Sequence, residues 1–524
     1  MGSKDRTVAR KARAFGVACL ALAATSAAAQ AIPLPGRMVG LTEFLREVVR
    51  TNPSVREARL QWLISTGQAR AEWGLYEPAF DGSYQQDGLR QQNTSLQQFQ
   101  QLGQQVYDQK NDAFTVGVGG ALPTGATYNL KASVTRLQDT YVEQGQFQSF
   151  VGVTANQPLL KGFTNGAPFA SIRTAFEDRI IAFHEYRRQI AATVSQAETA
   201  YWNLAFAQEV SRMSAASVKV AQDLLEVSKA AASAGRMSDL DVRQAESELS
   251  ARKSAQEDSD LSLNESQRQL RLLLGDQSDL SKGTIVAADP IVSDGAGSWD
   301  PGGQTDALLE WARRAQPDYM IASEQAHRES ILVGYQKDQA LPELNLTGSY
   351  GYSGLGTTPQ DSLSSLQTQA YPNWTVGVEL KVPLLLGVRQ RNNLEVEQLK
   401  SELASVRLQA TGQQMEDAIA SLARSVGTLL SHIENQRAVA EAKSHLLDVQ
   451  NAGLRAGTAS LLDVYGAEDA LRQAQQAELD AVVRYRQAMM DLERTSGTVL
   501  RDNDLEKLQD GQVVLDEELR TGSH

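Results

Sequence analysis

The residue types that most often carry catalysis or bind metal ions are few in this chain and lie far apart. The five histidines are His184, His327, His432, His445 and His524. The segment HEYRR, which begins at His184, lacks the second histidine of a zinc-binding helix motif. The single cysteine, Cys19, excludes a disulfide framework and a cysteine-ligated zinc site. We therefore expect no catalytic residues, no metal site and no cofactor.

A glycine-rich segment, VGVGGALPTG, begins at Val116 and superficially suggests a phosphate-binding loop. It lacks the Lys-Ser/Thr pair that follows the glycines of such loops, and it falls within a predicted strand hairpin. No Ser/His/Asp arrangement has supporting sequence context either. We attribute these glycines to sheet geometry and expect the protein not to be an enzyme.

Composition and charge narrow the class of protein. The chain has 524 residues and a net charge of −13, so it lacks the basic surface that nucleic-acid binding needs. Only 6% of the residues are aromatic, while Ala, Gln, Leu, Ser and Glu crowd the middle and the C-terminal third. That composition favours long helices over a compact α/β enzyme.

Residues 1–31 have the features of an export signal. A positive segment precedes an apolar run from Ala14 to Ala24, and small residues then offer cleavage sites near Ala29. Gly16 stands where a lipoprotein signal places leucine before its cysteine, so we do not expect lipidation at Cys19. No later segment has 18 consecutive apolar residues, and we expect no transmembrane helix in the mature chain.

Three pairs of similar segments indicate an internal duplication. VGVTANQPLLKG at Val151 matches VGVELKVPLLLG at Val376. The other pairs are NPSVREARL with QPDYMIASE, and AGRMSDLDVRQAESEL with AGTASLLDVYGAEDAL. Their common order predicts a first repeat over residues 32–275 and a second over 304–500. We expect 276–303 to be a linker and 501–524 to be an acidic tail.

Both repeats contain segments in which apolar and polar residues alternate. They lie near residues 79–86, 113–121, 126–136 and 149–156 in the first repeat, and near 344–352 and 375–382 in the second. Such strands suit a soluble sandwich or a membrane β-barrel. Strand lengths of about 9 to 11 residues, aromatic strand ends, and long polar connections (88–111 and 138–148) alternating with a tight turn favour the barrel. We expect the Gln-rich connection 88–111 to be a flexible, solvated loop.

Long helices are predicted after each PLL segment, over about 168–233 and 388–455, and each would extend roughly 100 Å. Shorter helices return over about 238–274 and 461–496, with apolar spacing suited to coiled-coil-like packing. Gly235 and Gly457 fit the C-terminal caps of the long helices.

The strand-to-helix junctions share a pattern that explains the repeated sequence. Proline lacks an N–H group and ends strand pairing, the leucines anchor the chain, and glycine relaxes the corner. The junction residues are Pro158, Leu159, Leu160 and Gly162 in the first repeat, and Pro383, Leu384, Leu385 and Gly387 in the second.

The chain resembles the TolC family of outer-membrane efflux and secretion channels over nearly its whole mature length. The PLL junctions, AYWNLAFAQ at Ala200 and RAGTASLLDVYGAEDALRQAQ at Arg455 carry the resemblance. It implies a mixed fold, with a membrane β-barrel joined to a long α-helical coiled-coil barrel, internally duplicated and trimeric. It also implies a location in the outer membrane of a diderm bacterium, with contact to outer-membrane lipid and a large periplasmic portion. The implied partners are a periplasmic adaptor and an inner-membrane transporter of the RND, ABC or a similar class.

The resemblance also assigns roles at the periplasmic tip. Asp241 and Asp463 resemble acidic residues that narrow and gate the entrance, although aspartates there also suit helix N-termini. The turns where an adaptor would dock contain Gly235, Arg236, Gly457 and Ser460. Gly466 and Ala459 depart from the family pattern of a second aspartate and an arginine latch, which puts the detailed latch in doubt.

The strand count departs from the family pattern too. The usual member supplies two strands per half, whereas four are predicted in the first half here. A trimer would then close about 18 strands rather than about 12, unless the additional hairpin folds outside the barrel.

Three functions remain open at this stage. The first is the exit channel of a tripartite efflux system for drugs, toxic compounds or metal ions. The second is the outer-membrane channel of a type I protein or peptide secretion system, and the third is a periplasmic coiled-coil scaffold without a pore. The scaffold does not explain the paired strands with aromatic ends. The gene neighbourhood would separate the first two, because the transporter selects the cargo.

Overall fold

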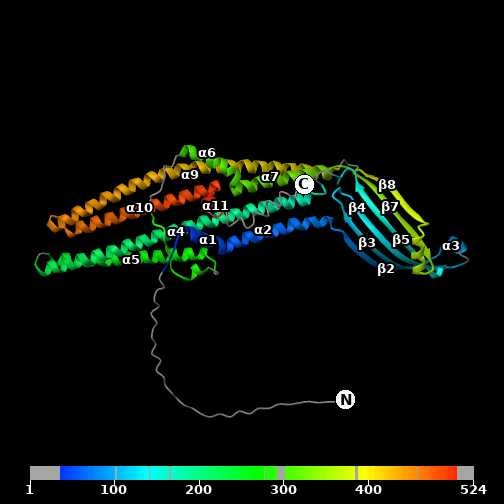
Figure 1. Ribbon diagram of the computed structural model, residues 1–524, viewed down its shortest axis with the longest axis horizontal. Coiled ribbons are helices and arrows are strands. Elements are labelled where there is room, and N and C mark those ends of the chain that lie inside the picture. The colour runs from blue at the N-terminus through cyan, green and yellow to red at the C-terminus, as the bar shows by residue number, and fades with distance from the viewer. Residues whose placement is uncertain are drawn as a thin grey trace, which may run out of the picture.

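A computed structural model describes residues 36–100, 103–140, 142–163, 167–235, 237–275, 278–291, 301–383, 387–456, 458–503 and 505. The molecule is elongated, with long helices at one end and one β-sheet at the other (Figure 1). The predicted signal segment 1–31 lies outside the described residues.

Two long helical hairpins form most of the molecule. The first pairs α4 (Ala170–Ser233) with α5 (Asp239–Leu273), and the second pairs α9 (Val388–Ala456) with α10 (Leu461–Ser496). With 64 and 69 residues, α4 and α9 each extend about 100 Å. The two hairpins run side by side (Figure 1). Their observed limits confirm the predicted helices to within about two residues.

Shorter helices flank the hairpins. They are α1 (Leu41–Thr51), α2 (Pro53–Ala71), α6 (Pro301–Ala315), α7 (Pro317–Gln339) and α11 (Val499–Asp502), with 3₁₀ turns η1 (Glu72–Tyr76) and η2 (Asp279–Lys282). The helices α2 and α7 begin in the same way: proline is the first residue, and the side chain of Asn52 or Gln316 accepts a backbone hydrogen bond. Because α2 packs on α4 and α7 packs on α9 and α4, the duplication is visible in three dimensions as well as in sequence.

The other end of the molecule is a six-stranded antiparallel sheet. Its strands are β2 (Ala79–Gln92), β3 (Val106–Ala121), β4 (Thr127–Asp139), β5 (Val142–Pro158), β7 (Glu343–Gly356) and β8 (Pro372–Lys381), in that spatial order. The pairing of β5 with β7 joins the two repeats. All six predicted strands exist and belong to one sheet, so the additional hairpin is part of the sheet rather than folded beside it. The strands β2 and β8 form its two edges.

The expected long loops 88–111 and 138–148 are largely wrong. The ladder between β2 and β3 continues to the pair Gln92–Val106, and a short helix, α3 (Ser95–Gln100), follows β2. The strands β4 and β5 likewise extend to Asp139 and from Val142. Backbone pairing continues beyond the apolar zone because ladder hydrogen bonds do not require apolar side chains. A second short helix, α8 (Pro359–Gln367), connects β7 with β8.

A compact core lies beside the middle of the hairpins. The strands β1 (Arg37–Val39) and β6 (Ile285–Ala287) pair in parallel, and Ile285 is buried together with Leu280. The Tyr201 hydroxyl donates to Asp289 Oδ2 at 2.6 Å. Residues 278–291, within the predicted linker, contribute apolar side chains to this core. Leu505, within the predicted acidic tail, is also buried here, and residues 506–524 lie outside the described part of the chain.

No helix in the described part of the chain combines the length and the apolar character needed to cross a membrane.

Candidate functional site

The turn between α4 and α5 forms one tip of the molecule. Gly235 follows the last turn of α4 with φ of +70°, and its N–H donates to the Ala232 carbonyl at 2.9 Å. A left-handed conformation at this position is the usual end of a helix and suits glycine. The predicted cap at Gly235 is confirmed. Arg236, and Gly457, which corresponds to Gly235 in the second hairpin, lie outside the described residues.

Asp241 and Asp463 occupy equivalent positions in the two hairpins. Each is the third residue of its returning helix and forms a capping box with a serine: Ser238 Oγ lies 2.7 Å from Asp241 Oδ2, and Ser460 Oγ lies 2.6 Å from Asp463 Oδ2. The hydrogen bonds from these serines lower the pKa of both carboxyls. The helix-capping alternative is thus realised at both positions, and each carboxylate stays charged at neutral pH.

A buried ionic network behind the tips ties the hairpins together. Arg252 on α5 donates to Asp469 on α10 at 2.5 Å and pairs with Glu248 at 2.7 Å, and its side chain is 8% exposed. Ser217 on α4 also donates to Glu468 on α10 at 2.9 Å. Arg252 lies about 20 Å along α5 from the turn. Among the described residues, Arg252 is the cation closest to the tips that forms an ion pair between the two hairpins.

Sequence reasoning missed this network. Arg252 and Asp469 lie on helices of different repeats, and no local motif relates them. The sequence signal that could have indicated this contact is the position of both residues on the inward faces of predicted helices. Buried apolar contacts among Ala245, Leu461 and Tyr465 accompany the network near the tip.

The corner between β5 and α4 has the expected proline at the end of the strand and the expected glycine at the turn, but Leu160 is exposed and backbone bonds to the second repeat continue beyond Pro158. Pro158 is the last residue of β5, the Leu159 N–H donates to the Leu344 carbonyl at 2.7 Å, and Leu160 is partly exposed. Gly162 has φ of +82°, and its N–H donates to Asp338 Oδ2 at 2.8 Å. The chain therefore turns at Gly162 while remaining bonded to the second repeat.

The second corner repeats this geometry where it is described. The strand β8 ends at Lys381, Pro383 follows it, and Gly387 has φ of +64° immediately before α9. Leu384 and Leu385 lie outside the described residues. Both predicted corner glycines thus have a positive φ, which residues with a Cβ atom rarely adopt.

The turn between β3 and β4 packs against the first corner. Gly125 has φ of +81°, and a Cβ atom placed there would lie 2.0 Å from the carbonyl oxygen of Gly162. The second repeat has no equivalent hairpin: the nearest atom to a Cβ on Gly387 is the side-chain Oε1 of Gln390, at 3.2 Å. The additional hairpin is therefore fitted closely to the corner.

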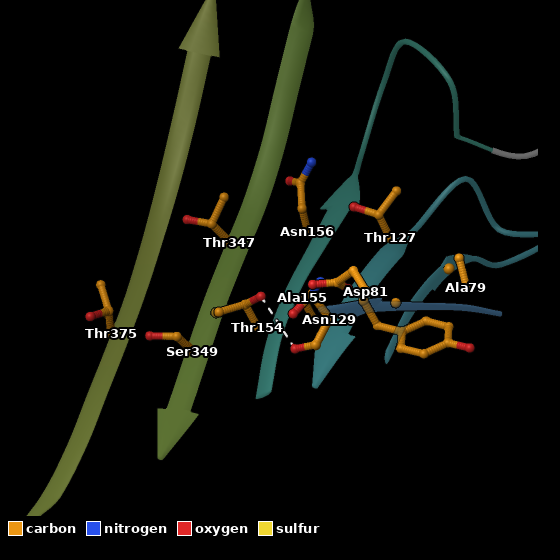
Figure 2. A pocket seen from close by; sticks show the side chains of 14 residues that line it. Ala79, Asp81, Thr127, Asn129, Thr154, Ala155, Asn156, Thr347, Ser349 and Thr375 are labelled. Atoms are coloured by element: carbon orange, nitrogen blue, oxygen red, sulfur yellow. Dashed lines mark hydrogen bonds between the residues drawn. The ribbon is translucent and has the colours of Figure 1, made fainter. Parts of the chain in front are cut away.

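One face of the sheet carries small polar side chains in register. Figure 2 shows Thr127 and Asn129 of β4, Thr154 and Asn156 of β5, Thr347 and Ser349 of β7 and Thr375 of β8. These side chains line a hollow whose volume is about 620 Å³. The pairs Asn129–Thr154, Thr154–Ser349 and Ser349–Thr375 are direct neighbours across the strands. This continuous polar row is suited to contact with water.

The opposite face is apolar and exposed in the single chain. Trp374, Val376, Val378 and Leu380 of β8 are each 63 to 68% exposed. Leu130 and Val153 continue the face on neighbouring strands. A large apolar surface opposite a polar one is typical of a strand set with lipid on one side and water on the other.

The chain is similar to known outer-membrane channels. Residues 123–276 and 317–498, one segment in each repeat, match the family model "Outer membrane efflux protein". The chain is 28% identical over 205 residues to the outer membrane protein TolC of Vibrio cholerae, a match covering 37% of this chain and less than half (44%) of TolC.

Solved structures share the fold. The CmeC channel of Campylobacter jejuni has a TM-score of 0.61 at 16% identity, covering 88% of this chain and 86% of CmeC. The open-state MtrE channel of Neisseria gonorrhoeae has a TM-score of 0.62 at 18% identity, covering 88% and 89%. These are channels of the outer membrane with a large periplasmic helical part, and they are transport proteins rather than enzymes. The family match covers more than half of the chain, which therefore belongs to the outer membrane efflux protein family.

Proposed function

We propose that three copies of the chain form the exit duct of a tripartite efflux system. In this proposal an inner-membrane pump delivers small molecules (drugs, toxic compounds or metal ions) through a periplasmic adaptor. The observation that carries the proposal is the six-stranded sheet, which has a polar and an apolar face and two unpaired edges. It is supported by the membership of the chain in the efflux protein family.

The open edges require partners. The outer edges of β2 and β8 have no neighbouring strand in the chain, and unpaired backbone groups are not tolerated in a lipid layer. Six strands are fewer than the 8 of the smallest outer-membrane barrels. Pairing β2 of one copy with β8 of the next in a ring of three gives 18 strands, a number that leaves an aqueous channel. The row of threonine, serine and asparagine side chains then lines the water.

The helices would extend this channel into the periplasm. The glycine corners direct each long helix away from the sheet, so the tips at Gly235 and Ser460 lie about 100 Å from the membrane end of the helices. We place the channel entrance at these tips. Carboxylates of Asp241 and Asp463 from three copies would form a negative ring that attracts cations, a role compatible with their capping bonds.

The adaptor would dock at the tip turns. In the sequence, Gly235 and Arg236 lie between α4 and α5, and Gly457 and Ser460 lie between α9 and α10. Exposed Leu240 and Leu462 stand next to these turns on the returning helices and offer apolar contacts. Substitution of these leucines by glutamate should reduce adaptor binding without altering the trimer.

Cysteine cross-linking tests the ring of three. Residues 32–524 contain no cysteine, so introduced pairs give an unambiguous result. One cysteine replaces Tyr84 on β2, and a second replaces Val376, Val378 or Leu380 on β8 in three separate variants that sample the register. All these positions lie on the apolar face. The variants are oxidised in membranes. At least one of the three should then give disulfide-linked dimers and trimers of the chain and no larger species.

A matched control places the first cysteine at Val134 on the interior strand β4, which has both neighbours within its own chain. This control should give no species of three chains. Monomers from every edge pair, together with a monomeric mass in native mass spectrometry, would contradict the proposed duct.

A further inference from the structure

Two acidic side chains and a histidine meet where α4 and α7 pack against each other below the sheet. Glu177 lies on α4, and Glu324 and His327 lie one turn apart on α7. His327 Nδ1 is 3.0 Å from Glu177 Oε1. One oxygen from each glutamate and one imidazole nitrogen all lie within 4.8 Å of one another. Two helices of different repeats thus bring three potential metal ligands together.

The Glu177 carboxylate is the unusual member of this cluster, which we call the α4–α7 cluster. Its side chain is only 9% exposed, and its Oε2 atom is buried without a hydrogen-bond partner. A buried carboxylate with an unsatisfied oxygen is unfavourable unless a cation or a donor completes it.

The nearest arginine on α7 is already engaged elsewhere. Arg328 pairs with Asp178 at 2.7 Å and with Glu329 at 3.0 Å. His327 is an ion-pair partner of Glu177, and it is charged only when protonated.

The donor set has a recognisable chemistry. A Glu-x-x-His pair on one helix with a glutamate on the facing helix is the arrangement by which helical bundles hold divalent transition metals. Imidazole nitrogen with carboxylate oxygen suits Zn²⁺ and similar ions, whereas Mg²⁺ and Ca²⁺ prefer oxygen ligands alone. Tetrahedral donors about 2.0–2.2 Å from Zn²⁺ lie about 3.3–3.6 Å apart. The three ligand atoms, which lie within 4.8 Å of one another, would therefore have to move together by up to about 1.5 Å.

Access for an ion is also present. Glu177 and His327 line a hollow of about 880 Å³ between α2, α4, α7 and the β3–β4 turn, and Arg70, Arg173 and Arg179 line it as well. His327 itself is 61% exposed, so water can occupy the remaining coordination positions. We propose that Glu177, Glu324 and His327 bind one divalent transition-metal cation of the Zn²⁺ type. Such an ion would join the first repeat to the second just below the membrane sheet, a structural role separate from transport.

Zinc binding to the purified full-length protein in detergent tests this site. The protein is stripped with a chelator and titrated with ZnCl₂ by calorimetry, and bound zinc is then counted after dialysis. We expect about one Zn²⁺ per chain. Glu177→Gln and His327→Gln should each weaken binding by more than about tenfold, because even indirect partners of metal ligands affect affinity by about 10- to 100-fold.

Glu329→Gln is the matched control, because it removes one carboxylate from the same turn of α7 but leaves the cluster intact. It should bind zinc as the wild type does. The His327→Gln variant keeps the test valid if Glu177→Gln fails to fold, since His327 is exposed. Co²⁺ offers a second readout: its visible absorption bands should show imidazole coordination in the wild type and lose it in His327→Gln.

Two results would overturn the proposal. One is the absence of stoichiometric zinc, which would leave the two glutamates sharing a proton instead of a metal ion. The other is zinc binding that survives both Glu177→Gln and His327→Gln, which would place the metal elsewhere. Neither result bears on the duct, because the cross-linking experiment does not depend on metal.

Discussion

The two repeats of the molecule use the same local chemistry for their helices but differ in their strands. Proline starts both α2 and α7, serine–aspartate boxes start both α5 and α10, and glycines at positive φ turn both corners. Yet the first repeat contributes β2 to β5, and the second contributes only β7 and β8. The comparison shows which parts of the architecture are constrained and which can grow.

The difference follows from the path of the chain. Each repeat enters the sheet from a short helix and leaves it into a long helix on the same side, so each must cross the sheet an even number of times. Two and four strands both satisfy this condition. An added hairpin widens the sheet without moving either corner, whereas a single added strand would send the long helix to the wrong side. The lengths of the long helices and the geometry of the corners cannot vary between the repeats in this way.

The largest difference between the repeats should appear at their glycines. Gly125→Ala should destabilise the protein by about 4 kcal/mol or more, since its Cβ would meet the Gly162 carbonyl as well as disfavour the left-handed backbone. Gly387→Ala has only the backbone penalty, about 1–2 kcal/mol. Yield in the outer membrane and denaturant midpoints measure both. Equal losses would mean that the additional hairpin does not press on the corner.

A smaller but substantial effect is expected where the two repeats are joined by charge. Arg252→Gln removes the buried partner of Asp469 and Glu248 and should lower the free energy of unfolding by about 3 kcal/mol. Arg268→Gln on the same helix breaks an exposed pair with Glu265 and should leave the free energy of unfolding nearly unchanged. Denaturant unfolding of both variants gives the comparison, and a similar small change in both would show that the network is not a structural link.

The junction of the repeats should also respond to pH. Burial, and then the charges of Glu198 and Asp502, raise the pKa of Glu493 to about 8. The folded state therefore retains a proton that the unfolded state releases near pH 4.5, so this group lowers stability progressively as the pH rises from about 4.5 to about 8. Glu493→Gln should be more stable than wild type by on the order of 2 kcal/mol at pH 8.5 and nearly equal to it at pH 4.5. Melting temperatures across this range measure the difference, and a constant offset would contradict the assignment.

The smallest effects should be equal in the two repeats. Ser238→Ala and Ser460→Ala each remove the serine half of a capping box and should each cost about 1 kcal/mol. Helix content and thermal stability of the two variants check this equality. A large excess for one of them would show that its serine does more than cap a helix.

The sequence predicted the ends of helices well where proline, serine or glycine marks them. Proline, serine and glycine located the ends of α10 to the residue and those of α4 to within two residues. The strand ends were missed because β2 and β3 continue through polar residues, where only backbone pairing maintains the strand.

The candidate sites divide in the same way. The corner glycines and the capping aspartates belong to short motifs and could be predicted. The Arg252–Asp469 link and the α4–α7 cluster join residues far apart in the chain, so only helix packing reveals them. The expectation of no metal site rested on the scattered histidines. His327 lies close to Glu177 only because α7 packs against α4.

Single-channel conductance in planar bilayers tests the proposed duct most directly. The protein purified as a trimer is compared with the Asp241→Ala/Asp463→Ala variant, with Ser238→Ala/Ser460→Ala as the control for lost helix caps. A small, cation-selective conductance that increases and loses selectivity only in the aspartate variant is the expected result. The absence of any conductance from folded trimers of all three proteins would contradict a continuous duct through the sheet and helices.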